Sequence, residues 1–398
     1  MITRDPSLNP LLSGIRAPLI RFVRELIAIP SPSGREERII RRIRQEMERL
    51  GYDRIRTDAM GNLTGQVGSG RRTIVLDGHC DTVEKGQSRN WEIDPFRGQC
   101  AGGIIRGLGA VDQKGGLAAA IYAGHLVKKT GIPSGITLLV AATVLEEPFE
   151  GLSWDHLIGE TGLQPEAVVL TEPTGLDICI GHRGRMEFCL TTGGKTSHVA
   201  NPHLGENAIY KMAPIIGEIE KLNRQMPDTR PLGKGTVTIS RISSTAPSRN
   251  AVADSATLIL DRRLTVGETP QGSLAQLAAL PAVRKSDARV TVTRRRAISY
   301  TGAEFEVPSA FPGWVMDPSD PLVKRGIRAG RVLFGRELTC RPWHFSTNGV
   351  STRGRHNIPT IGLGPGDDTL AHTPAEALPL TDLLLATAFY TRLIRDWS

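Results

Sequence analysis

The segment Ile74-Val75-Leu76-Asp77-Gly78-His79-Cys80-Asp81-Thr82-Val83 joins an apolar run to a short polar motif. Its apolar first half is typical of a buried strand, and the polar residues that follow mark the rim of a sheet. Because side chains alternate along a strand, His79 and Asp81 point to one side, and Cys80 points away from them as a small packing residue. The sequence therefore predicts an imidazole and a carboxylate together at the end of one strand.

Two further segments also lead to acidic residues. Asp112 lies in Gly107-Leu108-Gly109-Ala110-Val111-Asp112-Gln113-Lys114-Gly115-Gly116, directly before an alanine-rich predicted helix. A loop bounded by glycines is a common position for a ligand. The run Thr137-Leu138-Leu139-Val140-Ala141-Ala142-Thr143-Val144 predicts a strand that leads to the adjacent pair Glu146 and Glu147. Two like charges beyond a buried strand are costly unless a cation is there, so we expect one.

Two more residues complete a set that suits a pair of metal ions. Glu172 lies in Leu170-Thr171-Glu172-Pro173-Thr174, and His372 lies in Ala371-His372-Thr373, shortly after Gly364-Pro365-Gly366. Two metals about 3.5–4 Å apart need one bridging carboxylate, with imidazole and further carboxylates as the other ligands. One acid, Glu146 or Glu147, then stays free as general base. For Glu172 the alternative is a turn, because acids before proline commonly open turns.

These motifs resemble the acetylornithine deacetylase, succinyl-diaminopimelate desuccinylase and carboxypeptidase G family of co-catalytic zinc metallopeptidases. The resemblance runs from Leu26 to Glu376, with the motifs in the family's order. It implies that Asp81 orients a ligand, that Asp112 bridges the metals and precedes a cis peptide, and that Glu146 is the general base. The metal ligands that it implies are His79, Asp112, Glu147, Glu172 and His372. It also implies two divalent ions per subunit, zinc first, with cobalt or manganese as alternatives.

The order of predicted elements predicts an α/β fold with an insertion. Up to residue 182, strands alternate with helices, which is typical of a layered α/β domain. From 183 to 300 the order is β-α-β-β-α-β, which is the ferredoxin-like α+β pattern. Because Glu172 precedes this segment and His372 follows it, we expect residues 1–182 and 301–398 to form the catalytic domain. The resemblance implies that the inserted domain, 183–300, is a lid and dimerisation domain. The expected strands are 73–76, 103–106, 137–144, 167–170, 185–192, 235–242, 256–264 and 288–293, and the expected helices are 17–28, 35–50, 117–129, 205–225 and 272–279.

The insert contains three candidate residues that the resemblance assigns. His198 matches a histidine that reaches the partner subunit's active site and stabilises the oxyanion, which implies a homodimer; the alternative is a capping residue in a turn. Asn250 and Arg263 match positions that hold substrate. A guanidinium binds a carboxylate through two hydrogen bonds, which favours substrates with a free carboxylate. Both residues are alternatively ordinary surface residues of the insert.

The function expected from these features is hydrolysis of an amide bond beside a free carboxylate, as in N-acyl amino acids or dipeptide-like molecules. The segment Phe345-Ser346-Thr347-Asn348-Gly349-Val350 departs from the family, because relatives carry an acidic substrate-contacting loop where this chain has Asn348. This segment and Asp261-Arg262-Arg263-Leu264-Thr265 resemble the selenium-metabolism-linked hydrolase branch. Alternative functions are a dipeptidase, a carbamoyl-amide hydrolase, or a non-catalytic binding protein of the same fold.

Length and composition set the remaining expectations. At 398 residues the chain exceeds what one core usually supports, so two domains are expected. The net charge is +8, but most arginine clusters are mixed with acids, as in 35–49, which argues against nucleic acid and suits small anionic substrates. No apolar run approaches the roughly 20 residues of a membrane span. The five cysteines show no paired spacing, which predicts reduced thiols and a cytoplasmic protein.

Overall fold

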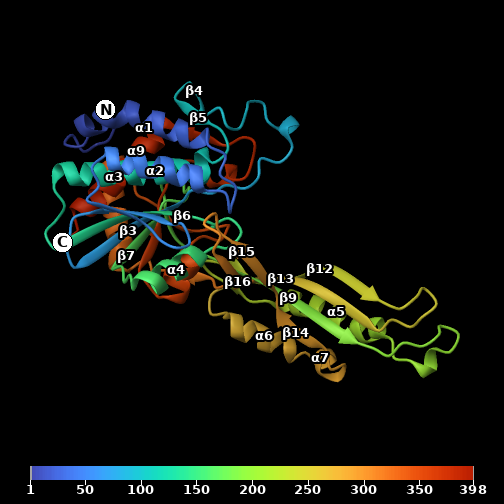
Figure 1. Ribbon diagram of the computed structural model, residues 1–398. Coiled ribbons are helices and arrows are strands. Elements are labelled where there is room, and N and C mark those ends of the chain that lie inside the picture. The colour runs from blue at the N-terminus through green and yellow to red at the C-terminus, as the bar shows by residue number, and fades with distance from the viewer. Residues whose placement is uncertain (1, 398) are drawn as a thin grey trace.

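The computed structural model describes residues 2–397 and consists of an α/β body that carries an elongated insert, as Figure 1 shows. Each part has its own hydrophobic core. The core of the body is built from residues up to Ile180 and again from Ala297 onward. The core of the insert is built from residues between Met186 and Val283.

The body is organised around a nine-stranded mixed sheet with the order β1-β2-β6-β3-β7-β20-β8-β18, in which β19 also pairs with β8. Its strands are β1 (Arg54–Thr57), β2 (Leu63–Val67), β3 (Arg72–His79), β6 (Ile136–Thr143), β7 (Ala167–Leu170), β8 (Ile178–His182), β18 (Trp314–Val315), β19 (Cys340–Trp343) and β20 (Thr360–Gly362). The central strands β3, β6, β7 and β20 are parallel. Parallel strands covered on both faces are apolar along their length, which is why the runs at 73–76, 137–144 and 167–170 predicted them.

Helices cover both faces of this sheet. Those labelled α1 (Asn9–Ile27), α2 (Glu37–Arg49), α3 (Gly115–Thr130) and α9 (Leu380–Arg395) lie together above the sheet in Figure 1, and α4 (Leu152–Thr161) lies below it. The helix α8 (Pro321–Phe334) packs against α9. The helix predicted at 17–28 begins eight residues earlier, because buried Leu12 and Ile15 extend its apolar face past Pro18.

A smaller sheet lies beside the segment that contains Asp112. It has the order β21-β5-β4, with bounds β4 (Gln99–Ala101), β5 (Ile104–Arg106) and β21 (Ala377–Pro379). The run at 103–106 is thus a strand, but it belongs to this separate sheet. Among residues 2–397, no helix is both long and apolar enough to cross a bilayer.

The insert has the α+β arrangement that the sequence predicts. Its sheet has the order β12-β13-β9-β14, antiparallel throughout, with helices α5 and α6 packed against it. The elements are β9 (Gly184–Gly193), α5 (Ala208–Gln225), β12 (Thr236–Thr245), β13 (Ser255–Leu264), α6 (Pro270–Ala278), α7 (Pro281–Lys285) and β14 (Arg289–Val292), besides the short pair β10 (Asp228–Thr229) and β11 (Gly233–Lys234). Met186, Phe188 and Leu190 are buried, whereas the residues between them on β9 lie on the opposite, half-exposed face.

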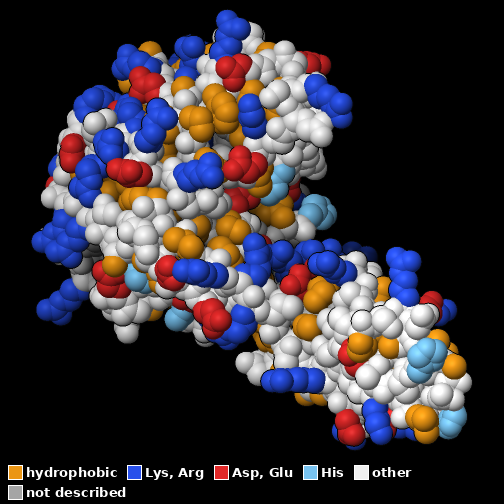
Figure 2. All heavy atoms as spheres, turned by 45° about the vertical axis from the view of Figure 1, so that its right-hand side comes forward, with side chains coloured by type: hydrophobic (Ala, Val, Ile, Leu, Met, Phe, Trp, Pro, Cys, Tyr) orange, Lys and Arg blue, Asp and Glu red, His pale blue; other side chains and the backbone are white. Residues whose placement is uncertain are grey.

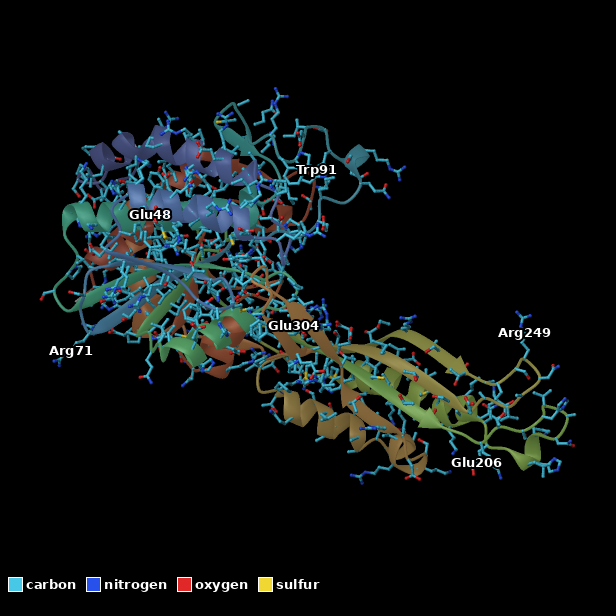
Figure 3. All side chains as sticks on the ribbon, in the orientation of Figure 1. Glu48, Arg71, Trp91, Glu206, Arg249 and Glu304 are labelled. Carbon is cyan, nitrogen blue, oxygen red and sulfur yellow. The ribbon has the colours of Figure 1, made fainter. Side chains whose placement is uncertain are left out.

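The chain returns to the body through the hairpin of β15 (Arg294–Ile298) and β16 (Glu304–Pro308), and then through β17 (Ala310–Phe311), which pairs with β9. Glu304, at the start of β16, is labelled in Figure 3 where the insert meets the body. The hairpin is anchored by Tyr300, whose hydroxyl donates to the backbone oxygen of Gly61 at 3.1 Å.

Candidate metal centre

The first predicted ligand, His79, lies at the end of the central strand β3 and is buried. Its Nδ1 is 3.0 Å from the backbone oxygen of Asp81, so the Nδ1–H tautomer leaves Nε2 free to bind a cation. The carboxylate of Asp81 is also buried, and its Oδ2 accepts a hydrogen bond from the hydroxyl of Ser33 at 2.7 Å. Asp81 therefore lies behind the imidazole as an orienting residue would.

Asp112 lies between the two predicted histidines. Its Oδ1 is 3.0 Å from Nε2 of His79, and its Oδ2 is 3.3 Å from Nε2 of His372. The peptide bond from Asp112 to Gln113 is cis, as the resemblance implies. The side-chain oxygen of Gln113 accepts hydrogen bonds from the backbone N–H of His79 and the hydroxyl of Thr171, which ties this loop to the ends of two strands.

The pair Glu146 and Glu147 lies on a turn that two buried carboxylates hold. Asp81 accepts a hydrogen bond from the backbone N–H of each, at 3.2 Å in both cases. The preceding residue, Leu145, has φ 57° and donates its N–H to Oε1 of buried Glu36 at 3.1 Å. Since a left-handed leucine is unfavourable, the hydrogen bonds to these carboxylates help to offset the cost of this backbone conformation.

The predicted ligands converge on two adjacent positions. Around the first, Nε2 of His79 is 3.7 Å from Oε1 of Glu172 and 3.9 Å from Oε2 of Glu146. Around the second, Nε2 of His372 is 2.8 Å from Oε2 of Glu147. His372 reaches this position from a loop residue with φ 61° and keeps half of its side-chain surface exposed. The shared neighbour of both positions is Asp112.

The charge of the acids in this cluster is only partly compensated. Burial, and next the charge of Asp112, raises the pKa of Glu172 to about 8. Burial likewise raises the pKa of Glu146 well above its ordinary value. Burial alone would raise the pKa of Asp112, but the hydrogen bonds to His372 and His79 lower it overall. The hydrogen bonds to Asp112 and Glu147 in turn raise the pKa of His372 to about 10. The buried carboxylates of this cluster therefore outnumber the imidazoles that face them, an arrangement that favours a bound cation.

The donor set fits divalent cations. Oε1 of Glu146 and Oε2 of Glu172 are buried and have no hydrogen-bond partner among residues 2–397. A buried carboxylate oxygen without a donor is unfavourable unless a cation takes it. His79 groups with Asp112 and Glu147, and again with Glu146 and Glu172, with all ligand atoms of a group within 4.8 Å of one another. Carboxylate oxygen with imidazole nitrogen is the donor set of zinc and similar ions.

A cavity of about 310 Å³ opens over this cluster. The residues that line it are Asp112, Glu146, Glu147, Glu150, Glu172, Arg185, Arg263, His344, Phe345, Ser346, Asp368, Ala371 and His372. The predicted substrate residue Arg263 is therefore part of the wall. Figure 2 shows basic side chains gathered where the body and the insert meet.

His198 and Asn250 lie far from this cavity in the same chain. They are neighbours at the tip of the insert, where the N–H of Val199 donates to the backbone oxygen of Asn250 at 3.0 Å. Figure 3 labels Arg249 and Glu206 at that tip, at the end farthest from the body. Neither residue is part of the wall of that cavity.

The position of Asn348 differs from the expectation that segment 345–350 is a substrate-contacting loop with a neutral residue in place of an acid. It is buried, and its Nδ2 donates to Oδ2 of Asp77 at 3.0 Å and to the hydroxyl of Thr143 at 3.1 Å. Its oxygen accepts the N–H of Gly151. The residues of this segment that line the cavity are Phe345 and Ser346 instead.

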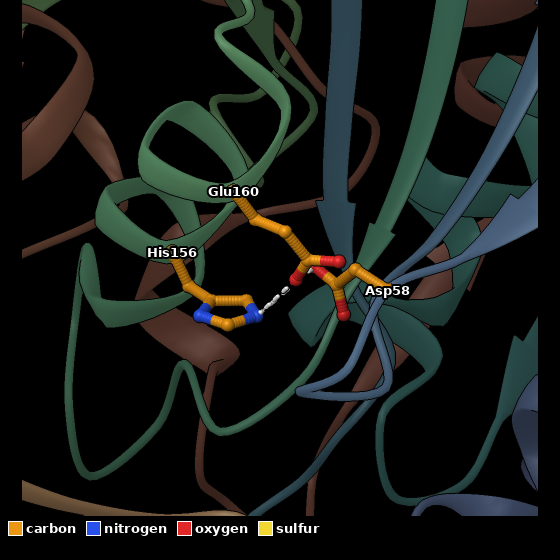
Figure 4. Close-up of side chains that lie close together, drawn as sticks. All are labelled: Asp58, His156 and Glu160. Carbon is orange, nitrogen blue, oxygen red and sulfur yellow. Dashed lines mark ion pairs between the residues drawn. The ribbon is translucent and has the colours of Figure 1, made fainter.

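A second group of potential ligands lies on another part of the body (Figure 4). It consists of Asp58, His156 and Glu160, with Nε2 of His156 2.7 Å from Oε2 of Glu160. Asp58 already accepts hydrogen bonds from the backbone of Gly61 and from both nitrogens of Asn62. These contacts close the β1–β2 turn, so we regard the group as a structural contact.

Several cavity residues have no signal in the sequence. Glu150 follows the Glu146-Glu147 pair but has no motif of its own, and Arg185 occupies an ordinary position near the start of a strand. His344 lies in no recognisable motif, and it lines the cavity together with Asp368. Only the tertiary fold brings these residues next to the candidate metal ligands.

Comparisons with known proteins agree with this geometry. The model of peptidase family M20/M25/M40 matches residues 75–396. An uncharacterised protein named YgeY from Escherichia coli (strain K12) is 43% identical over 382 residues, which cover 96% of this chain and 95% of that protein. A succinyl-diaminopimelate desuccinylase from Rhodospirillum centenum is 27% identical, with coverage of 95% and 97%.

Solved structures share the fold. The aminopeptidase PepT from Bacillus cereus matches with a TM-score of 0.71 at 23% identity and covers 96% of this chain and 98% of its own. YXEP from Bacillus subtilis, described as a dinuclear metal-binding peptidase of the M20 family, matches with a TM-score of 0.69 at 15% identity and the same coverage. The family model spans well over half of the sequence. The chain therefore belongs to peptidase family M20/M25/M40 and is an enzyme that hydrolyses amide bonds.

Proposed function

We propose that this enzyme uses two divalent metal ions, zinc first, to cleave the amide bond of an N-acyl amino acid or dipeptide-like substrate with a free carboxylate. The observation that carries the proposal is the position of Asp112 between His79 and His372, with one oxygen toward each. In this proposal His79, Asp112 and Glu172 hold one ion, and His372, Asp112 and Glu147 hold the other.

Two bound ions would supply an activated water and polarise the scissile carbonyl. Glu146 also lies beside His79 and Glu172, but we assign it as the acid outside both ligand sets; its Oε1 is buried and has no hydrogen-bond partner among residues 2–397. Since burial raises its pKa, its carboxylate is a good acceptor for a proton from water and, once protonated, a good donor to the leaving amine. The carboxylate of Asp81 accepts the backbone N–H of Glu146 and lies 3.5 Å from Nδ1 of His79, and the backbone oxygen of Asp81 is 3.0 Å from the same Nδ1, so Asp81 acts as a positioning residue.

We further propose that residues 183–300 form a lid and dimerisation domain, attached to a catalytic domain of residues 1–182 and 301–398, and that His198 stabilises the oxyanion of the partner subunit. Two observations support this. His198 and Asn250 lie at the insert tip, distant from the cavity of their own chain. Large apolar side chains are exposed on α5, the loop before it and the edge strand β12: Val199, Leu204, Ile209, Tyr210 and Ile242. Exposed apolar groups near one another are typical of an interface.

The test is a substrate panel with purified protein reconstituted with zinc, cobalt or manganese. The panel contains N-acetyl and N-succinyl amino acids, dipeptides and N-carbamoyl amino acids, so it also separates the dipeptidase and carbamoyl-amide alternatives. Glu146→Gln is the matched control, because it keeps the shape of the side chain and removes the base. We expect hydrolysis of one class by the wild-type protein and none by Glu146→Gln at an unchanged metal content. Wild-type activity in Glu146→Gln would refute the assignment of the base.

A further inference from the structure

Two arginines stand directly opposite each other on neighbouring strands at the root of the insert. Arg185 of β9 pairs in register with Arg263 of β13. Both lie on the half-exposed face of that sheet, away from its helices, and both line the cavity over the metal cluster. Directly opposed residues of antiparallel strands have Cβ atoms about 4.5–5.5 Å apart. The two side chains therefore leave the sheet side by side and line the same cavity.

Like charges in this arrangement destabilise a sheet unless an anion lies between them. One carboxylate of the protein partly compensates the charge of each arginine. Nη2 of Arg185 is 3.1 Å and 3.3 Å from the two carboxylate oxygens of Glu150, and Nε of Arg263 donates to Oδ1 of Asp261 at 2.8 Å. Asp261 and Arg263 are both more than one third exposed, and exposed pairs of this kind contribute little.

Each guanidinium keeps donors for a ligand. A guanidinium has five N–H groups, and these contacts use only one nitrogen on each arginine. Nε of Arg185 is buried and has no acceptor among residues 2–397, so the N–H groups left for a ligand on this arginine are those of its two Nη atoms. In contrast, both Nη atoms of Arg341, near the same cavity, donate hydrogen bonds to Asp368, and Nη2 also donates to the backbone oxygen of Thr174. The charge of Arg341 is therefore already compensated within the protein.

Arg185 is also held in place more firmly than a surface arginine. Its guanidinium stacks over the ring of Phe311 at 4.8 Å from the centroid. Its partner Glu150 is buried in the body, three residues after Glu147. A planar group fixed between an aromatic face and a buried carboxylate loses little further entropy when it binds a ligand. Glu150 thereby positions Arg185 at a fixed place relative to the metal ligands.

We propose that Arg185 is a second carboxylate-binding residue of this site, beside Arg263, which the resemblance already assigns to substrate, and that Glu150 positions Arg185 for this role. The inference rests on the proposed amide hydrolysis and assigns to Arg185 a share of the preference for an acid over the corresponding uncharged carboxamide. Arg185 has no counterpart among the residues that motif resemblance identifies. It is therefore a specificity residue that only the register of β9 and β13 identifies.

The experiment measures binding of two matched probes, N-acetylglycine and N-acetylglycinamide, by isothermal titration calorimetry. The protein is the full chain loaded with zinc and carrying Glu146→Gln, so that no turnover interferes. We expect the Glu146→Gln protein to prefer the acid. Arg185→Met and Arg263→Met should each reduce the ratio of the affinities for acid and carboxamide about tenfold to a hundredfold, which is the usual contribution of hydrogen bonds to charged groups. Arg183→Met is the matched control, because Arg183 donates to the backbone of Lys234 and is not part of the cavity wall.

Two further variants separate ligand binding from a structural role. Arg185→Lys keeps the charge but lacks the planar fork, so an intermediate preference is expected. Glu150→Gln should lower the preference severalfold in the presence of Arg185 and have no further effect in Arg185→Met, because the two act as one unit. An acid preference that survives Arg185→Met in a folded, zinc-loaded protein overturns the proposal. If the acid preference depends on Arg185 but the substrate panel shows no hydrolysis, this subsite stands and the proposed reaction fails.

Discussion

The carboxylate of Glu376 accepts a hydrogen bond from the backbone N–H of Asp112 at 3.3 Å, although 264 residues separate them in the sequence. The same side chain accepts the N–H groups of Val111 at 2.9 Å and Gly109 at 3.2 Å. Glu376 is buried, so these contacts are shielded from water. One acid from the end of the chain thus fixes the loop that presents the carboxylate shared by both candidate metal positions.

Glu376→Ala should weaken metal binding without removing any ligand. Because the loop loses three acceptor contacts, we expect a loss of about tenfold to a hundredfold in metal affinity, the usual effect of removing a group that orients a ligand. Competition with a chromogenic chelator measures this affinity. Glu48→Gln, an exposed change on α2 away from the cavity, is the control and should leave affinity unchanged. Equal affinities for Glu376→Ala and the wild-type protein would contradict the orienting role.

Asn348→Asp should destabilise the protein and leave substrate affinity nearly intact. The new carboxylate would face buried Asp77 in place of the amide that now donates to it. An uncompensated buried charge costs about 3–5 kcal/mol, which denaturant unfolding at neutral pH detects readily. A loop residue that contacts substrate would instead change KM at normal stability. Such a change in KM would restore the interpretation of this segment as a substrate loop.

The sequence predicts the elements well where its patterns are local, and less well where distant segments meet. The buried strand before His79 and the alternation along β9 follow from apolar periodicity, so both were predictable. The burial of Asn348 was not, because its partners Asp77 and Thr143 come from two other strands. In a similar way Arg185 becomes a cavity residue only through its register with another strand. Such positions are set by tertiary pairing, for which a single sequence carries no signal.

His182 should make folding stability depend on pH. Its ring is buried, with Nδ1 2.9 Å from the backbone oxygen of Arg183 and Nε2 accepting the N–H of Thr347, which only the neutral ring satisfies. Burial lowers its pKa from 6.5 to about 4. Between pH 6.5 and about 4, His182 is protonated in the unfolded chain but stays neutral in the folded protein. Stability is therefore complete above pH 6.5 and falls as the pH drops toward 4, by about 3 kcal/mol in all.

Urea unfolding of the wild-type protein and His182→Gln at pH 7, 6 and 5 tests this dependence. The variant keeps a donor and an acceptor but does not titrate, so its stability should fall less steeply with decreasing pH. His203→Gln, in an exposed segment of the insert, controls for the loss of an ordinary histidine. Parallel pH profiles for the wild-type protein and His182→Gln would show that this ring is not the source of the dependence.

If His198 acts in the partner subunit, two inactive variants should restore activity when combined. Glu146→Gln removes the base, and His198→Ala removes the oxyanion donor, so each homodimer is inactive or strongly impaired. In a mixed dimer, the subunit that keeps Glu146 receives His198 from its partner, and one complete site results. After subunit exchange, half of the dimers are mixed and half of their sites are complete, so recovery should approach about a quarter of wild-type activity. If His198 served its own chain, mixing would restore nothing, since no subunit would hold both groups. The insert tip lies at the end farthest from the body, which argues for the first outcome.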